Sequence, residues 1–304
     1  MLGVISARAV SGWFPAIHER PASKKGYPMP FIKTDDRTSL FYKDWGTGKP
    51  VVFVSSWALS GDMWEYQMLP LASQGLRCIA YDRRGHGRSD DPGHGYDFDT
   101  LADDLAALIE QLDLREVTLV GHSMGCPEIA RYLSRHGAGR VARVALISPT
   151  TPFLLRTADH PEGVPRVVFD AQIARLTTDR PLYFSDGAIK FFGLGSTWPA
   201  PPVLSPELVQ WAIRLILQSS PHAIVECFRA HIETDFRPDM RAFSMPTLII
   251  HGDKDQNAPL DMCGRRTAQA IAGSLLKVYE GAPHGLFLTE KERLSSDLLA
   301  FIHD

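Results

Sequence analysis

From residue 31 onward, short runs of apolar, β-branched residues alternate with longer segments in which apolar residues recur every three or four positions. A run that is apolar at nearly every position is typical of a parallel strand covered on both faces, whereas the longer period indicates an amphipathic helix. We expect strands at residues 40–45, 51–55, 77–82, 117–121, 141–148, 247–252 and 274–280. We expect helices at residues 100–112, 127–136 and 294–302.

This alternation predicts an α/β fold with right-handed crossovers and a doubly wound, mostly parallel sheet. It stops between residues 149 and 245, a stretch rich in aromatic residues with helical patterns at 164–176 and 206–218. We expect this stretch to form a mostly helical cap over the sheet. The predicted division is an N-terminal extension (1–30), a core (31–148 and 246–304) and a helical cap (149–245).

Composition narrows the classes of partner. The net charge is −3 and no basic run occurs, so we expect no nucleic-acid partner and no attraction to a membrane surface. No apolar run approaches the ~20 residues of a membrane span. The four cysteines lack the spacing of metal ligands, which favours reduced thiols in a cytoplasmic protein without a metal. The oligomeric state, homo-oligomers included, stays open.

A serine flanked by glycines follows one of the predicted strands. In Gly121-His122-Ser123-Met124-Gly125, the serine lies between the strand at 117–121 and the helix at 127–136. The five residues alone are a weak signal, and an inert serine in a glycine-rich turn is the alternative. With a strand before it and a helix after it, the turn exposes the hydroxyl at the carboxyl edge of the sheet. We predict Ser123 as a nucleophile.

A serine hydroxyl needs a general base that a third group holds in place. Of eleven histidines, His284 lies in a loop after a predicted strand and before the last predicted helix. His122 lies inside the serine turn, where its side chain points away from the seryl oxygen. Five others, His86, His94, His136, His222 and His303, fall in a polar turn or on helical stretches. We therefore predict His284 as the base.

Two aspartates compete for the third position. Asp253 and Asp255 both follow the buried strand at 247–252, so both start near the serine's edge of the sheet. Turn aspartates often only bond nearby backbone, and the residues alone leave the choice open. Two backbone amides are expected to stabilise the developing oxyanion. These are the amide of Met124 and that of Trp57, in the loop after the strand at 51–55.

These residues resemble the cofactor-free haloperoxidase and arylesterase branch of the α/β-hydrolases, from about residue 29 to the C-terminus. The resemblance rests on Phe41-Tyr-Lys-Asp-Trp45, Asp62-Met-Trp-Glu-Tyr-Gln67, Asp82-Arg-Arg-Gly-His-Gly-Arg-Ser89, the segment 117–125, Asp235-Phe-Arg-Pro-Asp-Met240 and Tyr279-Glu-Gly-Ala-Pro-His-Gly285. It implies an α/β-hydrolase fold with a helical cap, and no metal or organic cofactor. It also implies a triad of Ser123, Asp255 and His284, with Trp57 and Met124 as oxyanion donors. Asp255 is favoured because the family's acid lies four residues before a proline, here Pro259.

The sequence departs from the branch at four places. Ser55-Ser56 stands where relatives have His-Gly, Ala58 where they often have proline, and Cys126-Pro127 where they have glycines. His231 and Asn257 occupy positions where relatives tend to place apolar pocket residues. We expect a substrate pocket lined by His231, Asn257, Phe153 and Leu286, and more polar than in relatives. It should prefer hydroxy- or oxo-substituted substrates, a preference that His231→Phe should reverse.

The segment from Asp82 to Ser89 is charged and rich in glycine, which could indicate phosphate binding. No helix with the spacing of a phosphate-binding loop follows it. We interpret it as a solvated turn.

The predicted activity is hydrolysis of small carboxylic esters or lactones through an acyl-serine intermediate. Proline after Trp57 would confine the loop, and Ala58 does not. We therefore expect peracid formation and halide oxidation to be minor, and we expect Ala58→Pro to raise the ratio of perhydrolysis to hydrolysis without abolishing the acylation burst. Two alternatives stay open, a carbon–carbon bond hydrolase of ring-fission products and a non-enzymatic ligand receptor on the same scaffold.

Overall fold

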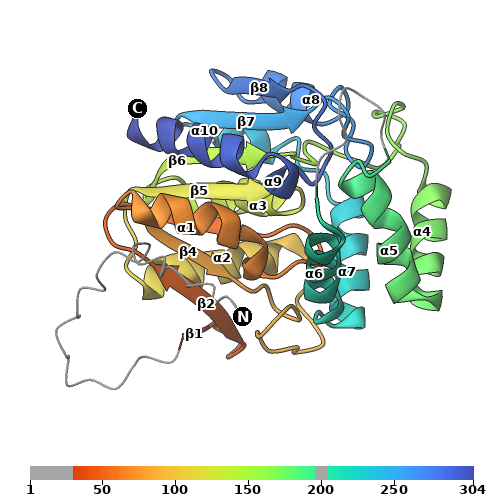
Figure 1. Ribbon diagram of the computed structural model, residues 1–304, viewed down its shortest axis with the longest axis horizontal. Coiled ribbons are helices and arrows are strands. Elements are labelled where there is room, and N and C mark those ends of the chain that lie inside the picture. Colours follow the sequence, from red (N-terminus) through yellow and green to blue (C-terminus); the bar gives the residue numbers. More distant parts are fainter. Residues whose placement is uncertain (1–29, 196–203) are drawn as a thin grey trace, which may run out of the picture.

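The computed structural model describes residues 30–195 and 204–304, and an eight-stranded sheet lies at its centre (Figure 1). The strands occur in the order β1-β2-β4-β3-β5-β6-β7-β8. The β1–β2 and β2–β4 pairs are antiparallel, and every other neighbouring pair is parallel. The strands are β1 (Phe31–Lys33), β2 (Ser39–Trp45), β3 (Pro50–Val54), β4 (Arg77–Tyr81), β5 (Val117–His122), β6 (Val141–Ile147), β7 (Thr247–Gly252) and β8 (Leu275–Tyr279).

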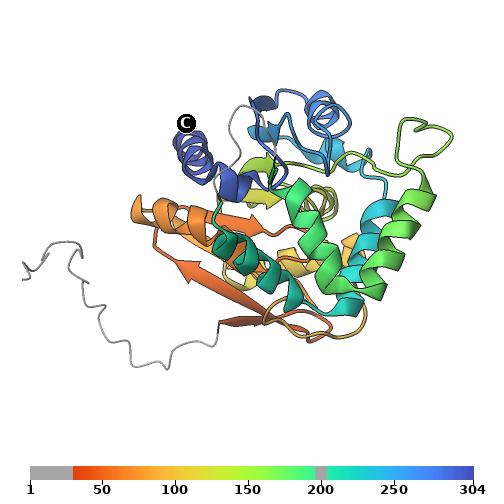
Figure 2. The ribbon, with the colours of Figure 1, turned by 45° about the vertical axis from the view of Figure 1, so that its right-hand side comes forward.

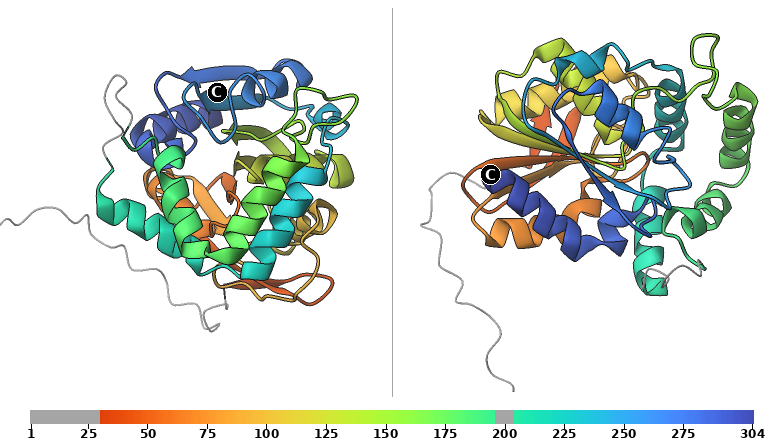
Figure 3. Two further views of the ribbon diagram at one scale, coloured as in Figure 1. Left: turned by 90° about the vertical axis from the view of Figure 1, so that its right-hand side faces the viewer. Right: turned by 90° about the horizontal axis from the view of Figure 1, so that it is seen from above.

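Helices cover both faces of this sheet (Figures 1 and 3). One face carries α1 (Glu65–Ser73) and α10 (Lys291–His303), and the other carries α2 (Phe98–Gln111) and α3 (Gly125–His136). Shorter elements connect these layers: the 3-10 turns η1 (Gly61–Trp64) and η2 (Asp239–Ala242), and the helices α8 (Gly264–Ala270) and α9 (Leu286–Thr289).

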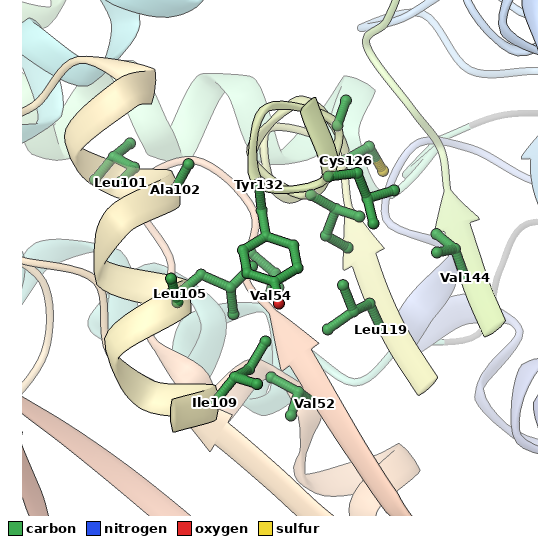
Figure 4. Close-up of a cluster of buried hydrophobic side chains, with 14 of the residues drawn as sticks. Val52, Val54, Leu101, Ala102, Leu105, Ile109, Leu119, Cys126, Tyr132 and Val144 are labelled. Carbon is green, nitrogen blue, oxygen red and sulfur yellow. The ribbon is translucent and has the colours of Figure 1, made fainter. Parts of the chain in front are cut away.

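Strand β3 shows why the two faces form separate cores. Successive side chains of a strand point to opposite faces of its sheet. Val52 and Val54 accordingly pack against α2 and α3 (Figure 4), whereas Val51 and Phe53 pack under α1 and α10. All four side chains are fully buried, and burial of each contributes about 1.5–3 kcal/mol. The apolar run at 51–54 is thus a strand covered on both faces.

Four further helices are inserted between β6 and β7 and lie beyond the carboxyl ends of the parallel strands (Figures 2 and 3). They are α4 (Arg166–Thr178), α5 (Arg180–Phe191), α6 (Pro206–Leu217) and α7 (Pro221–Glu233). Ser205 and Ser220 begin α6 and α7, and each side chain accepts a hydrogen bond from an amide in the first turn. A proline follows each serine at the first helical position. Amides at this position have no acceptor within the helix, so the N–H that proline lacks costs no hydrogen bond.

The structure confirms the predicted α/β-hydrolase fold, its mostly parallel sheet and its inserted helical region. All seven expected strands are present, with ends that differ by at most one residue. The boundaries of the cap and the core stay predictions, and the extension at residues 1–29 lies outside the described residues. Every helix within residues 30–195 and 204–304 is too short or too polar to cross a bilayer.

Candidate active site

The site is built around a sharp turn between β5 and α3. Ser123 occupies it with φ of 53°, a left-handed conformation that is unfavourable for a residue with a side chain. A Cβ on Gly121 would lie 2.8 Å from the carbonyl oxygen of Gly125, and one on Gly125 would lie 2.4 Å from that of Val54. Only glycine lets the strand, the turn and the helix approach so closely. The geometry is that of the predicted nucleophile turn.

The structure joins Ser123, His284 and Asp255 in one hydrogen-bonded chain. Ser123 Oγ lies 2.9 Å from His284 Nε2, and His284 Nδ1 lies 2.6 Å from Asp255 Oδ2. The three residues are 3–5% exposed, so little water competes for these bonds. General-base activation of a serine requires this arrangement, with one imidazole nitrogen facing the hydroxyl and the other held by a carboxylate.

The structure separates the two aspartates that the sequence left open. Asp255 Oδ1 accepts the amides of Asn257 and Ala258 at 2.9 and 2.8 Å, which leaves Oδ2 for His284. Asp253 is exposed and accepts the amide of Gly281 at 2.7 Å. Only Asp255 therefore reaches the imidazole.

Sequence reasoning missed a second histidine on this carboxylate. His251 Nε2 lies 3.2 Å from Asp255 Oδ2 and 2.7 Å from the carbonyl oxygen of Ala258. Both neighbours are acceptors, so Nε2 carries the proton. Burial raises the pKa of Asp255, but the charge of His284 and hydrogen bonds from His251 and His284 outweigh it and hold the pKa below its usual value. The spacing of four residues between His251 and Asp255 was the available signal.

The backbone of His284 is fixed from two sides. Its carbonyl oxygen accepts a hydrogen bond from His122 Nε2 at 2.9 Å and from Ser148 Oγ at 3.3 Å. The next amide, of Gly285, donates to the carbonyl of Phe191 at 2.6 Å. Burial lowers the pKa of His122 to about 3, so this side chain is neutral near pH 7. His122 points away from the seryl oxygen, as predicted, and supports the loop of the base.

Two backbone amides are available for an oxyanion. Within residues 30–195 and 204–304, the amides of Trp57 and Met124 donate no hydrogen bond to another protein group. The side chain of Trp57 is held firmly, because Nε1 donates to the carbonyl of Ile224 at 2.9 Å and the ring stacks on Phe228 at 4.7 Å. These contacts tie the loop after β3 to α7.

Ala58, directly after Trp57, has φ of 64° and is fully buried. Its carbonyl accepts a hydrogen bond from Ser219 Oγ at 2.9 Å. Proline is locked near φ −65° and cannot adopt this conformation. The expectation for Ala58→Pro assumed a backbone that proline can adopt, whereas the structure has one at this position that proline cannot adopt.

The four predicted pocket residues lie in different surroundings. His231 is buried, and its Nε2 lies 2.7 Å from Thr150 Oγ1. Asn257 is exposed. Phe153 packs against the ring of His160, and Leu286 is fully buried in the core under α1 and α10. Phe191, which was not predicted, instead places its ring centroid 5.2 Å from that of His284.

The interpretation of Asp82–Ser89 as a solvated turn is wrong. Its first five residues are buried, and two of its three arginines each donate two hydrogen bonds to a buried carboxylate, Arg83 to Glu128 and Arg84 to Asp104. Asp82 accepts the amides of Gly61 and Arg88. The first five residues of the segment thus form a buried ionic network, and the chain reaches the surface at Arg88.

All four cysteines are buried, unpaired thiols. In the part of the chain that the structure describes, no group of three or more His, Cys, Asp or Glu side chains is arranged to hold a metal ion.

Known proteins are similar to this chain in sequence and in fold. A family model described as the alpha/beta hydrolase fold matches residues 49–291. A non-heme chloroperoxidase of Kitasatospora aureofaciens is 44% identical over 90% of this chain and 100% of its own. A bifunctional esterase/perhydrolase of Acinetobacter calcoaceticus is 38% identical over 90% of this chain and 99% of its own. The crystal structure of a bromoperoxidase from Bacillus anthracis has a TM-score of 0.85 at 38% identity, covering 90% of this chain and 99% of that one.

Proposed function

The chain belongs to the α/β-hydrolase family, in its branch of non-heme haloperoxidases and esterases, and we propose that it hydrolyses small carboxylic esters or lactones through an acyl-Ser123 intermediate. The observation that carries the proposal is the buried chain Ser123–His284–Asp255 beside two unpaired amides. A serine poised in this way has few other uses than acyl transfer.

The proposed reaction has two half-reactions. Ser123 Oγ attacks the ester carbonyl while His284 Nε2 takes its proton, and the amides of Trp57 and Met124 bind the oxyanion. His284 then gives the proton to the leaving alcohol. In the second half-reaction His284 takes a proton from water, which attacks the acyl group. His284 then returns this proton to Ser123 Oγ as the acid is released. Asp255 stabilises the imidazolium in both half-reactions.

Aromatic rings near the site support small, largely apolar acyl groups. Trp57 and Phe191 are half-buried, and the Phe191 ring meets the edge of the His284 imidazole. Trp57 also contacts Phe184 and Phe228 of the inserted helices. Rings in these positions favour an enclosed apolar subsite next to the serine.

Active-site titration tests the proposal. A p-nitrophenyl ester should release one nitrophenol per chain in a rapid phase, and an alkyl phosphonate should label Ser123, as located by mass spectrometry of the peptides. A ligand receptor would give neither result. A protein that turns over ring-fission diketones but no esters would favour the carbon–carbon hydrolase instead.

Perhydrolysis is a second candidate activity, supported by the similarity to an esterase/perhydrolase. Peroxide would replace water in the attack on the acyl-enzyme and release a peracid, with His284 taking the peroxide proton. We propose this as a minor reaction beside hydrolysis. The ratio of peracid to acid at fixed peroxide measures it.

Ala58→Pro is expected to lower the free energy of unfolding by about 3 kcal/mol or more, because φ of 64° is closed to proline. Hydrolysis and perhydrolysis should fall together, since the amide of Trp57 belongs to the same loop. Ala58→Gly is the matched control and should gain up to about 1 kcal/mol, as glycine adopts this φ freely. Urea unfolding and the two rates check this. A stable Ala58→Pro protein with an altered ratio would contradict it.

His231→Phe is expected to lower the free energy of unfolding by about 1–3 kcal/mol, because it leaves the buried hydroxyl of Thr150 without its partner. The predicted pocket role of His231 requires an imidazole without a hydrogen-bond partner, but in the structure its Nε2 lies 2.7 Å from Thr150 Oγ1. Adding Thr150→Val to His231→Phe should restore most of the loss. Urea unfolding of the three variants is the measurement, and a ranking of hydroxy against alkyl esters shows whether His231 also contacts substrate.

A further inference from the structure

A buried ion pair lies beside the serine turn, inside the segment that the sequence had indicated as solvated. The side chains of Arg83 and Glu128 are 2% and 0% exposed. Arg83 Nε and Nη2 donate to Glu128 Oε2 at 2.8 and 2.6 Å, and the hydroxyl of Tyr81 donates to Oε1. Such a pair is tolerated in a protein interior only when its remaining hydrogen-bonding groups also find partners.

The remaining N–H groups of Arg83 reach the loop that carries Trp57. Arg83 Nη2 donates to the carbonyl of Ser55 at 2.9 Å, and Nη1 lies 3.4 Å from that of Ser56. In a trans peptide the C=O and N–H bonds point in opposite directions. A carbonyl of Ser56 turned toward the guanidinium therefore turns the amide of Trp57 away from it, and that amide makes no other protein hydrogen bond within the described residues.

Glu128 connects the same guanidinium to the second amide. It lies in the first turn of α3, and that helix begins directly after Ser123 and Met124. Arg83 itself follows β4, which lies beside β3, and β3 lies beside β5. The Arg83–Glu128 pair therefore bridges the ends of three neighbouring strands, behind the two amides.

We propose that Arg83 is a positioning residue that, with Glu128, fixes the distance and direction between the amides of Trp57 and Met124. The proposal rests on the proposed function, because it assumes that these amides bind an oxyanion. The side chain of Arg83 is buried and its donors are directed at Glu128 and the carbonyls of Ser55 and Ser56, so its effect on the reaction is through the loop. An oxyanion site depends on such fixed donors, since movement of either by a fraction of an ångström weakens it.

The neighbouring residue offers a matched control. Arg84 donates from Nε and Nη2 to Asp104 at 2.7 Å each, and these side chains are 1% and 3% exposed. Nη1 donates to Asp36 at 2.9 Å, in the turn between β1 and β2. The burial is similar to that of Arg83, and each arginine donates two hydrogen bonds to a buried carboxylate, to Oε2 of Glu128 for Arg83 and to both oxygens of Asp104 for Arg84. The partners of Arg84 lie on α2, in the β1–β2 turn and at the carbonyl of His94.

The test compares Arg83→Lys with Arg84→Lys. Lysine keeps the charge but loses the planar fork, so both variants should lose a comparable part of their melting temperature. Each is assayed with a nitrophenyl ester at a temperature where circular dichroism shows it folded. Affinity for a phenylboronic acid is measured too, because its tetrahedral adduct with serine places an oxygen between the two amides.

Arg83→Lys should lower kcat and boronate affinity by about tenfold or more, with KM changed by less than about threefold. Arg84→Lys should change all three by less than about threefold. Arg83→Lys with wild-type kcat and boronate affinity would overturn the proposal, and so would an equal loss in Arg84→Lys. If Arg83→Lys does not fold, Glu128→Gln takes its place with the same expected pattern and the same overturning results. If the wild type neither turns over esters nor reacts with the phosphonate, the proposed function itself is wrong. If the wild type is active, a negative result contradicts only the proposed role of Arg83.

Discussion

Ser123→Ala is expected to remove the nitrophenol burst and to lower kcat by about 10⁴- to 10⁶-fold, with the unfolding curve almost unchanged. The variant loses the attacking oxygen, but its backbone keeps φ of 53° and its methyl group fits the same turn. The single side-chain bond lost is the one to His284 at 2.9 Å. Burst amplitude, kcat and a urea unfolding curve are the measurements. Residual turnover above about 1% of wild type would exclude Ser123 as the nucleophile.

Asp255→Asn should follow with a loss of about 10³- to 10⁴-fold in kcat/KM. The carboxylate accepts hydrogen bonds from two amides and two histidines, and an amide side chain cannot accept all of them. The Nδ2 group of asparagine would face a donor, which favours the wrong tautomer of His284.

Asp253→Asn is the control for this substitution. Asp253 follows the same strand, is exposed and accepts the amide of Gly281, so its variant should stay within about threefold of wild type. The opposite ranking of the two variants would show that Asp253 is the acid.

The elements that the sequence predicted well are those whose signal is local. The strand at residues 51–54 is apolar at every position because both faces of β3 are covered. The serine turn has glycines at the positions where a Cβ would lie within 3 Å of backbone atoms. His284 was accessible to the same reasoning, because a loop at the carboxyl edge of a parallel sheet reaches the end of β5.

The missed elements have weak local patterns. Strand β1 has three residues, too few for a period to show. Helix α1 contains Pro70 and little amphipathic character, so its formation depends on packing against α10 and β4. Helix α5 is capped by Asp179, whose side chain accepts a hydrogen bond from the amide of Leu182. This hydrogen bond is visible only in the folded chain.

Partners distant in sequence explain the remaining errors. Arg83 lies among other charged residues in the sequence, which favours an exposed side chain. In the structure it is buried, because it pairs with Glu128, 45 residues away. The φ of Ala58 likewise follows from burial and from a bond to Ser219, 161 residues away. Phe191 reaches His284 only because α5 packs over the sheet edge.

Buried neutral histidines should make this protein sensitive to acid. Burial lowers the pKa of His86, His122 and His231 from 6.5 to about 3 each. In the unfolded chain these residues bind a proton below pH 6.5, whereas in the folded chain they do not until about pH 3. Stability is therefore complete above pH 6.5 and falls as the pH decreases, by about 1.4 kcal/mol per pH unit for each histidine.

One carboxylate acts in the opposite direction. Burial raises the pKa of Asp104 to about 6, so the folded chain binds a proton there before the unfolded chain does. The net difference near pH 5 is then about two protons, which corresponds to a slope of about 2.7 kcal/mol per pH unit. At that slope a domain stable by about 5 kcal/mol at neutral pH, the lower end of the usual range of about 5–15 kcal/mol, unfolds near pH 5, and a more stable domain unfolds at a lower pH.

Urea unfolding between pH 4.5 and 8 gives the slope directly. His86→Asn provides the sharpest comparison, because His86 Nδ1 donates to the carbonyl of Arg84 at 2.9 Å and asparagine keeps a donor near that position without titrating. In this variant the dependence of the unfolding free energy on pH should be smaller by about one proton, or about 1.4 kcal/mol per pH unit, and the protein should unfold at a lower pH. A wild-type slope below one proton would mean that these histidines accept protons inside the fold.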